Sequence, residues 1–163
     1  MPSALIFGGS DSNADIGNTE EWIGAGADIG AWTTSTDMNT ARSQMGSAGT
    51  AQNAALGYGG YNGTAGVAIT ESWNGSAWTE VNDLSQARYQ VASGMGRTNT
   101  AAWCVTGLTS PPDTLYSNNE VWNGSSWTEV NNANQAKRGA RYSLTTCTAV
   151  DGSQSSLADR HST

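Results

Sequence analysis

The residues best suited to acid–base chemistry in this sequence are two pairs of glutamates. Glu71 and Glu80 flank a tryptophan-rich segment, and Glu120 and Glu129 flank a second copy of it. Glycoside hydrolysis uses two carboxyl groups on either side of the bond to be broken, so each pair is a candidate for that chemistry. Because the pair recurs with the same neighbours, we favour a solvated or structural linking role over catalysis.

Other catalytic constellations lack the residues they need. The chain has one histidine, His161, and two cysteines, Cys104 and Cys147. Ser–His–Asp or Cys–His catalysis would depend on that single histidine, which lies in an atypical C-terminal segment. No cysteine or histidine spacing suggests zinc, and two small buried cysteines are favoured over a disulfide. We therefore predict a protein that is not an enzyme and carries no cofactor.

A calcium loop is the remaining candidate for a metal site. Asp11, Asn13 and Asp15 alternate as the first oxygen ligands of such a loop do. Its sixth position is Ile16 instead of glycine, and its twelfth is Trp22 instead of glutamate. These departures favour a polar connecting loop, and we predict no metal site.

Composition and charge limit the classes of partner that the protein is expected to bind. The 163 residues carry a net charge of −7, only 13% of them are charged, and Lys and Arg form no cluster. Nucleic acid and anionic membranes are therefore disfavoured as partners. No segment approaches the roughly 20 apolar residues of a membrane helix, and the N-terminus has no signal-peptide pattern. Plentiful Gly, Asn, Thr and Trp favour short strands and turns over helices.

A repeated unit must position all of these residues. In each of three copies a basic residue follows the second of two tryptophans by ten positions (32 to 42, 78 to 88 and 127 to 137). The second tryptophans are Trp32, Trp78 and Trp127, and the basic residues are Arg42, Arg88 and Lys137. A period of about 40–50 residues containing several short strands is typical of propeller blades.

Each unit divides into four short strands. An apolar strand ends on a glycine pair in residues 4–9 and 54–60, and a related strand spans 101–107. Residues 73–78 and 122–127 are predicted hairpins, with Asn-Gly as a type I′ turn pair between the two arms. Another strand follows each basic residue, which completes the blade count of a propeller.

On these residues the chain resembles the kelch family of β-propellers. That family ends the second strand of each blade with Gly-Gly, places an aromatic residue on the third strand and Trp on the fourth, and has Arg near the next first strand. The matching residues are Gly8, Gly9, Gly59 and Gly60, then Trp22, Trp73 and Trp122, and then the tryptophans and basic residues named above. The form Trp-Asn-Gly-x-x-Trp-Thr-Glu-Val is similar to repeats of bacteriophage and bacterial surface proteins in this family.

The resemblance implies an all-β, kelch-like β-propeller with about three four-stranded blades in residues 1–150, followed by an atypical tail at 151–163. The copper site of the oxidases in this family needs two histidines, which a single chain with one histidine does not supply. The recurring tryptophans are predicted to pack between blades. The basic residues are predicted to form salt bridges or hydrogen bonds inside a blade.

Three blades are too few for closure, because propellers have four to eight. The chain begins at a second strand (4–9) and ends its repeats near a first strand (142–147). That last strand can complete the first blade of another copy. We therefore predict a homodimer that closes six blades, with a larger assembly or a longer propeller as the alternatives.

Segments 10–18, 61–66 and 108–119 vary between the units and are predicted to emerge as long loops on one face. Variable loops on a rigid scaffold are the usual layout of a binding surface. We predict that Tyr61, Asp113 and Tyr116 contact the partner.

These features predict a non-catalytic interaction or structural module. Its predicted partners are itself and a cell-surface glycan or virion protein, and the resemblance implies a virion appendage or an extracellular surface. The first alternative is a purely structural repeat protein of such an assembly. The second is a glycoside hydrolase-like enzyme that uses the paired carboxylates.

Overall fold

All regular structure in the described residues of this chain is β-strand. The computed structural model describes residues 3–23, 31–92 and 96–139. In chain order the strands are β1 (Ser3–Phe7), β2 (Thr19–Ile23), β3 (Ala31–Thr34), β4 (Gly46–Ala51), β5 (Ala54–Tyr58), β6 (Thr70–Trp73), β7 (Trp78–Val81), β8 (Gly96–Thr98), β9 (Ala101–Thr109), β10 (Thr114–Trp122) and β11 (Trp127–Val130). These ranges contain no helix, and so no helix that could span a membrane. The prediction of an all-β fold is confirmed.

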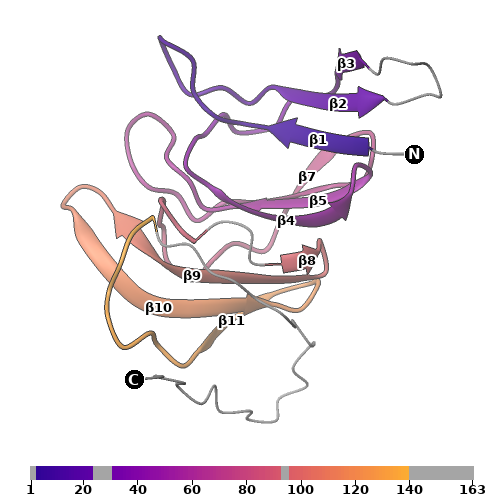
Figure 1. Cartoon of the computed structure of the whole chain (residues 1–163). Coiled ribbons are helices and arrows are strands. Elements are labelled where there is room, and N and C mark those ends of the chain that lie inside the picture. The colour runs from indigo at the N-terminus through magenta and orange to yellow at the C-terminus, as the bar shows by residue number, and fades with distance from the viewer. Residues whose placement is uncertain (1–2, 24–30, 93–95, 140–163) are drawn as a thin grey trace, which may run out of the picture.

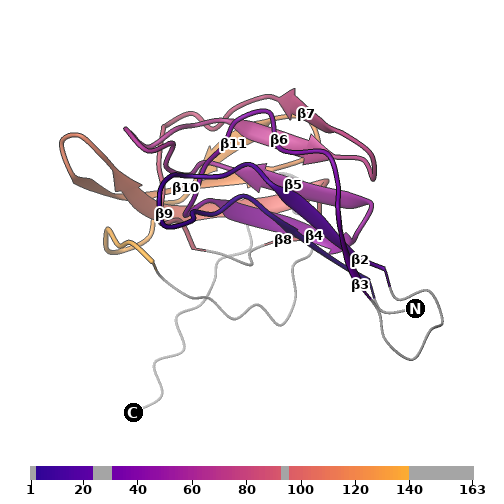
Figure 2. The same cartoon turned by 90° about the horizontal axis from the view of Figure 1, so that it is seen from above.

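The strands form three antiparallel sheets that follow one another along the chain. The N-terminal sheet has the order β1-β2-β3, the central sheet β4-β5-β6-β7, and the C-terminal sheet β8-β9-β10-β11. Figure 1 shows them stacked in this order from top to bottom. Figure 2 looks along the stack, and in it the three sheets overlap in projection.

The N-terminal sheet has one strand fewer than the others. In the central and C-terminal sheets, β4 and β8 pair with β5 and β9. Strand β1 corresponds to β5 and β9, but within the described ranges it pairs only with β2. The predicted strand at 142–147 and the tail at 151–163 lie outside the described residues.

The last two strands of each sheet place two tryptophans opposite each other. The cross-strand pairs are Trp22 with Trp32, Trp73 with Trp78 and Trp122 with Trp127, and their ring centroids are 5.5, 5.4 and 5.4 Å apart. Paired aromatic side chains stabilise antiparallel strands, so each pair fixes the register of its hairpin.

The turns of these hairpins differ from the type I′ prediction. Because Trp73 pairs with Trp78, the loop has four residues, and only Gly75 among them has a positive φ (96°). A type I′ turn needs a positive φ at both central residues. The Asn74 side-chain oxygen instead accepts hydrogen bonds from the backbone N–H groups of Ser76 and Ala77, at 2.9 and 3.0 Å. The prediction was wrong because the asparagine closes the loop with its side chain.

Segment 108–119 is also not the long loop that we predicted. β9 continues to Thr109 and β10 begins at Thr114, so these strands form an extended hairpin with only residues 110–113 at its tip. Leu108 opposes Leu115, and Thr109 opposes Thr114. These cross-strand pairs extend the ladder beyond the point at which the glycine pattern predicted its end.

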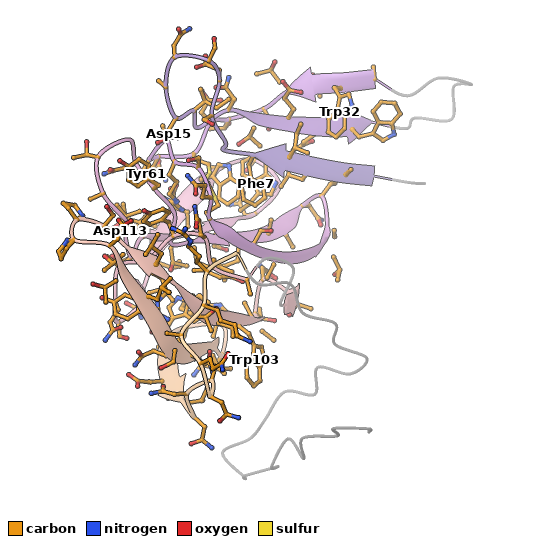
Figure 3. All side chains as sticks on the ribbon, turned by 60° about the vertical axis from the view of Figure 1, so that its left-hand side comes forward. Phe7, Asp15, Trp32, Tyr61, Trp103 and Asp113 are labelled. Carbon is orange, nitrogen blue, oxygen red and sulfur yellow. The ribbon has the colours of Figure 1, made fainter. Side chains whose placement is uncertain are left out.

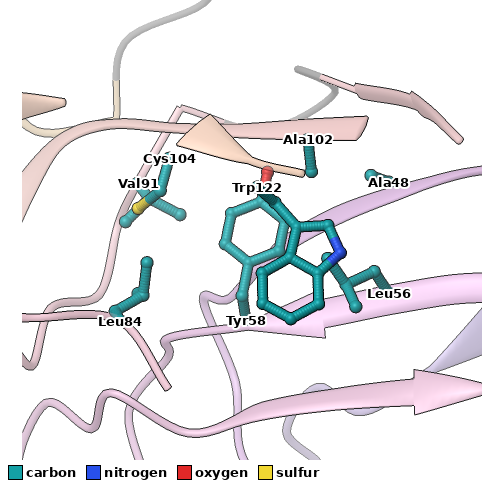
Figure 4. Close-up of a cluster of buried hydrophobic side chains, with 8 residues drawn as sticks. All are labelled: Ala48, Leu56, Tyr58, Leu84, Val91, Ala102, Cys104 and Trp122. Atoms are coloured by element: carbon teal, nitrogen blue, oxygen red, sulfur yellow. The ribbon is translucent and has the colours of Figure 1, made fainter. Parts of the chain in front are cut away.

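Two apolar clusters join the three sheets. Between the N-terminal and central sheets, Phe7 packs against Trp78 with ring centroids 4.7 Å apart. Between the central and C-terminal sheets, Tyr58 packs against Trp127 at 4.9 Å, beside Leu56 and Trp122 (Figure 4). In both clusters the strand that ends before the glycine pair, β1 or β5, faces the tryptophan pair of the following sheet. The chain therefore uses the same apolar contact twice.

Candidate functional site

Adjacent sheets meet at a contact that we call the seam, formed by the connector between two sheets and the third strand of the following sheet. At the first seam, Arg42 Nη1 lies 2.6 Å from Glu71 Oε1. At the second, Arg88 Nη2 lies 2.7 Å from Glu120 Oε1. All four side chains are fully buried. Arg42 and Arg88 thus form salt bridges between adjacent sheets, whereas the prediction placed such bridges inside one blade. The sequence did not identify their glutamate partners.

Each buried glutamate also receives hydrogen bonds from the connector. Glu71 Oε2 accepts from the backbone N–H of Asn39 at 2.8 Å and from its side-chain amide at 2.9 Å. Glu120 Oε2 accepts from the backbone N–H of Ser85 at 2.8 Å. Burial lowers the pKa of Arg42, and the charge of Glu71 opposes this effect. A buried charge is tolerated where such partners surround it. Among the described residues, only Nε of the Arg42 guanidinium is left without a partner at the first seam.

The connector is fixed to the preceding sheet by its backbone. The N–H groups of Gly9, Gly60 and Gly107 donate to the carbonyls of Arg42, Arg88 and Lys137 at 3.0, 2.9 and 2.9 Å. Lys137 therefore has the same backbone position as the two arginines. Its side chain, unlike theirs, is exposed.

Successive connectors are also bonded to each other. Gln90 N–H donates to Gln44 O at 3.0 Å, and Gly139 N–H donates to Gln90 O at 2.8 Å. Each of these residues follows a basic residue by two positions and has a positive φ, namely 54°, 50° and 58° for Gln44, Gln90 and Gly139. The repeat therefore imposes the same left-handed backbone three times, with glycine at the last position.

Two tryptophans cross the seams. Trp78 Nε1 donates to Thr19 Oγ1 at 2.9 Å, and Trp127 Nε1 donates to Thr70 Oγ1 at 3.0 Å. Trp73 and Trp122 instead donate to backbone carbonyls within their own sheets. The pair in the N-terminal sheet is different, since Trp22 is half-buried and Trp32 is 46% exposed.

The glutamate pairs that could serve hydrolysis have separate environments. Glu71 is buried in its ion pair, whereas Glu80 on the next strand is exposed. Glu120 and Glu129 differ in the same way, and Glu129 accepts a hydrogen bond from Asn118 at 2.9 Å. The buried member of each pair is thus committed to a seam. His161 lies outside the described residues.

The acidic residues near the N-terminus form a turn. Asp11 Oδ1 accepts hydrogen bonds from the N–H groups of Asn13 and Ala14 at 2.7 and 2.8 Å, and these bonds lower the pKa of Asp11. Asn62 caps the corresponding loop of the central sheet in the same way, with a neutral side chain. Residues 3–23, 31–92 and 96–139 contain no cluster of three potential metal-ligating acidic, histidine or cysteine side chains.

The loops after the glycine strands come together at one side of the molecule. Asp15, Tyr61 and Asp113 lie along this side in Figure 3. A Cβ at Gly63 would lie 3.5 Å from Asp15 Oδ2, and Gly66 N–H donates to Ser110 O at 3.4 Å. We call residues 10–18, 61–66 and 110–116 the loop face.

The three predicted contact residues differ in exposure. Asp113 is exposed at the hairpin tip, whereas Tyr61 and Tyr116 are half-buried. The Tyr61 ring lies 5.1 Å from the ring of Tyr89, and the Arg88 guanidinium lies 5.3 Å from the ring of Tyr116. Leu115, which is 45% exposed, was not identified from the sequence because an apolar residue in a predicted loop carries no signal.

Cys104 lies inside the second apolar cluster. Its side chain is fully buried, and burial raises the pKa of the thiol to about 12. The thiolate is the reactive form of cysteine, so Cys104 is a packing residue.

No family model matches the chain, and no curated protein matches its sequence. Its fold is similar to that of a solved structure of YjhT, with a TM-score of 0.62 and 10% sequence identity. The match covers 82% of this chain and 52% of that chain, so this chain spans about half the length of the solved one.

Proposed function

We propose that the chain is a kelch-like β-propeller module, each sheet being one blade, and that it acts by binding instead of catalysis. The seam supports the propeller, because the same ion pair, backbone bonds and aromatic contact recur from one sheet to the next. Units joined by a constant contact are related by a constant rotation, which closes a ring when enough units are present.

The observation that carries the binding function is the continuous loop face. Three loops from three different sheets meet there, while the strands and hairpins beneath them repeat. A rigid scaffold with variable loops is suited to recognition. The proposed partner is a surface glycan or a protein, and the module belongs to a virion appendage or an extracellular surface. Tyrosine rings stack on sugar rings, and the Asp113 carboxylate accepts hydroxyl hydrogen bonds.

A purely structural repeat protein is the second candidate. This structural role is favoured by exposed apolar side chains on the N-terminal sheet, namely Ile6 and Trp32, which are 52% and 46% exposed. A glycosidase is disfavoured because Glu71 and Glu120 already neutralise buried arginines.

The loop face can be tested by binding the labelled protein to a glycan array and to intact bacterial cells. Asp113→Lys should weaken binding at least about tenfold, as expected for the loss of a charged hydrogen-bond acceptor. Glu80→Lys reverses an equally exposed charge away from the loop face and should bind as the unmodified protein does. Absence of binding on both surfaces, or equal effects of the two variants, would contradict the proposed function.

A further inference from the structure

We propose that the two ends of the stack bind each other between two copies of this chain, with Lys137 of one copy paired to Glu20 of the other. This inference rests on the propeller architecture of the proposed function but not on its ligand. The proposed contact is a third seam, formed by the N-terminal sheet of one copy and the Lys137 connector of the other.

The charged half-sites follow from the repeat. Glu20 follows Thr19 as Glu71 follows Thr70, and the two glutamates lie on the equivalent strands β2 and β6. Glu71 is fully buried by its arginine, whereas Glu20 is only half-buried. Lys137 has the backbone bond of Arg42 but an exposed side chain. Each of the two end residues thus has the environment of a seam residue whose partner sheet is missing.

The polar surroundings of the pair are duplicated as well. Asn134 precedes Lys137 by three positions, as Asn39 precedes Arg42, and Asn39 gives two hydrogen bonds to Glu71. Asn134 can give the same two bonds to Glu20 of the second copy. The bonds from Gln90 to Gln44 and from Gly139 to Gln90 would continue from Gln44 of the second copy to the carbonyl of Gly139.

The apolar half-sites match in the same order. Phe7 and Tyr58 each pack on the fourth-strand tryptophan of the following sheet, and Val105 is their counterpart in the C-terminal sheet. Val105 and Trp103 form a small cluster with Ala92. The tryptophan that would follow is Trp32 of the second copy, which is 46% exposed. Figure 3 shows Trp32 and Trp103 at opposite ends of the molecule, so one chain does not join them.

The open edge of β1 fits the same second copy. A hollow beside β1 is lined by Leu5, Ile6 and Phe7 together with Gln44, Met45 and Ser47. In the central and C-terminal sheets, β4 and β8 occupy the edge that corresponds to this edge of β1. Each of them follows its connector, β4 after Arg42 and β8 after Arg88. Within the described residues no strand occupies the corresponding edge of β1, so this edge is available to the second copy.

The number of copies follows from closure. Two copies with three sheets each give six blades, which is within the usual range of four to eight, whereas three copies would give nine. In a ring of two copies, the Lys137–Glu20 seam occurs twice and is related by a twofold axis.

Charge reversal and complementation test this assignment by light scattering behind a sizing column. The unmodified protein should have twice the mass of the 16.9 kDa chain. Glu20→Lys and Lys137→Glu should each weaken dimerisation at least about 30-fold, because each places like charges in both seams. An equimolar mixture of the two variants should recover the dimer, since both seams of the mixed ring then pair opposite charges. Glu80→Lys is the matched control and should stay dimeric.

A monomeric unmodified protein, an open polymer, or a mixture that remains monomeric would overturn the proposal. Recovery in the mixture also establishes that both variants fold. A dimer that binds neither glycans nor cells would leave this interface intact and contradict only the proposed binding function.

Discussion

Arg42 and Glu71 meet without solvent exposure, their closest atoms 2.6 Å apart, although 29 positions separate them in the sequence. Arg42 lies on the connector that leaves the N-terminal sheet, and Glu71 lies on β6 of the central sheet. The pair therefore fixes how one sheet follows another. Arg88 and Glu120 have the same relationship one repeat later.

Removal of one member of such a pair should destabilise the fold strongly. Glu71→Gln leaves the buried Arg42 charge uncompensated, and we expect the free energy of unfolding to fall by about 3–5 kcal/mol. Urea denaturation followed by tryptophan fluorescence measures this change. Glu80→Gln alters an exposed carboxylate and should stay within about 0.5 kcal/mol of the unmodified protein. Equal midpoints for the two variants would show that the seam pair does not stabilise the fold.

The tryptophans of different sheets should contribute unequally. Trp78 is buried, packs on Phe7 and donates to Thr19, so Trp78→Ala should lower stability by about 3–5 kcal/mol. Trp32→Ala should lower the free energy of unfolding by less than about 1 kcal/mol. Both tryptophan variants are measured in a Lys137→Glu background, in which the second copy is not bound. A loss at Trp32 as large as that at Trp78 would mean that the first pair is already packed within one chain.

Thr106 occupies a position that the repeat gives to glycine. Its φ is +54°, close to the +64° and +62° of Gly8 and Gly59, and its buried hydroxyl has no hydrogen-bond partner among the described residues. Thr106→Gly should therefore raise the free energy of unfolding by about 1 kcal/mol, because a β-branched residue is strained there. Gly59→Ala should do the opposite, since its Cβ would lie 2.6 Å from the carbonyl oxygen of Arg88. A thermal unfolding scan in which Thr106→Gly melts at a lower temperature would contradict this prediction.

Alkaline pH should destabilise the second apolar cluster. Burial raises the pKa of Cys104 from 9.0 to about 12 and raises the pKa of Tyr58 well above its usual value. The folded chain therefore holds the protons of these two side chains more tightly than the unfolded chain does. The resulting contribution to the free energy of unfolding is complete below about pH 9 and is lost as the pH rises toward 12. Each such group contributes a slope of up to about 1.4 kcal/mol per pH unit.

Urea midpoints between pH 8 and 11 measure this slope, in a Cys147→Ser background that removes the second thiol. Cys104→Ala should decline less steeply over this range, because only the tyrosine contribution remains. If the urea midpoint falls equally steeply with pH with and without Cys104, the loss of stability at alkaline pH comes from other groups.

The sequence predicted the elements better than it predicted their partners. The spacing of Trp73 and Trp78 located a hairpin, because cross-strand pairing is local. The partner of Arg42 could not be read in the same way, since Glu71 recurs beside Glu80 with no local sign of which carboxylate becomes buried. Pairing between sheets depends on how the connector folds, and that is a long-range property.

The errors at the turns have local causes. Asn74 and Gly75 form the dipeptide preferred in two-residue hairpins, but the side chain of Asn74 captures two backbone N–H groups and stabilises a four-residue loop. At 108–119, Leu115 and Thr114 continue the strand past the usual glycine boundary. In both places side-chain contacts override the pattern set by the dipeptide or the glycine.

The near-identity of residues 73–81 and 122–130 has an evolutionary consequence. A recombination event that joins Trp73 to Asn123 would delete 49 residues (122 − 73) and leave one sheet built from β4, β5, β6 and β11. Arg42 would still meet Glu71, and Trp127 would take the place of Trp78 beside Thr19. Unequal crossing-over within this gene can thus lengthen or shorten the protein by whole repeats, with no compensating mutation at the new junction.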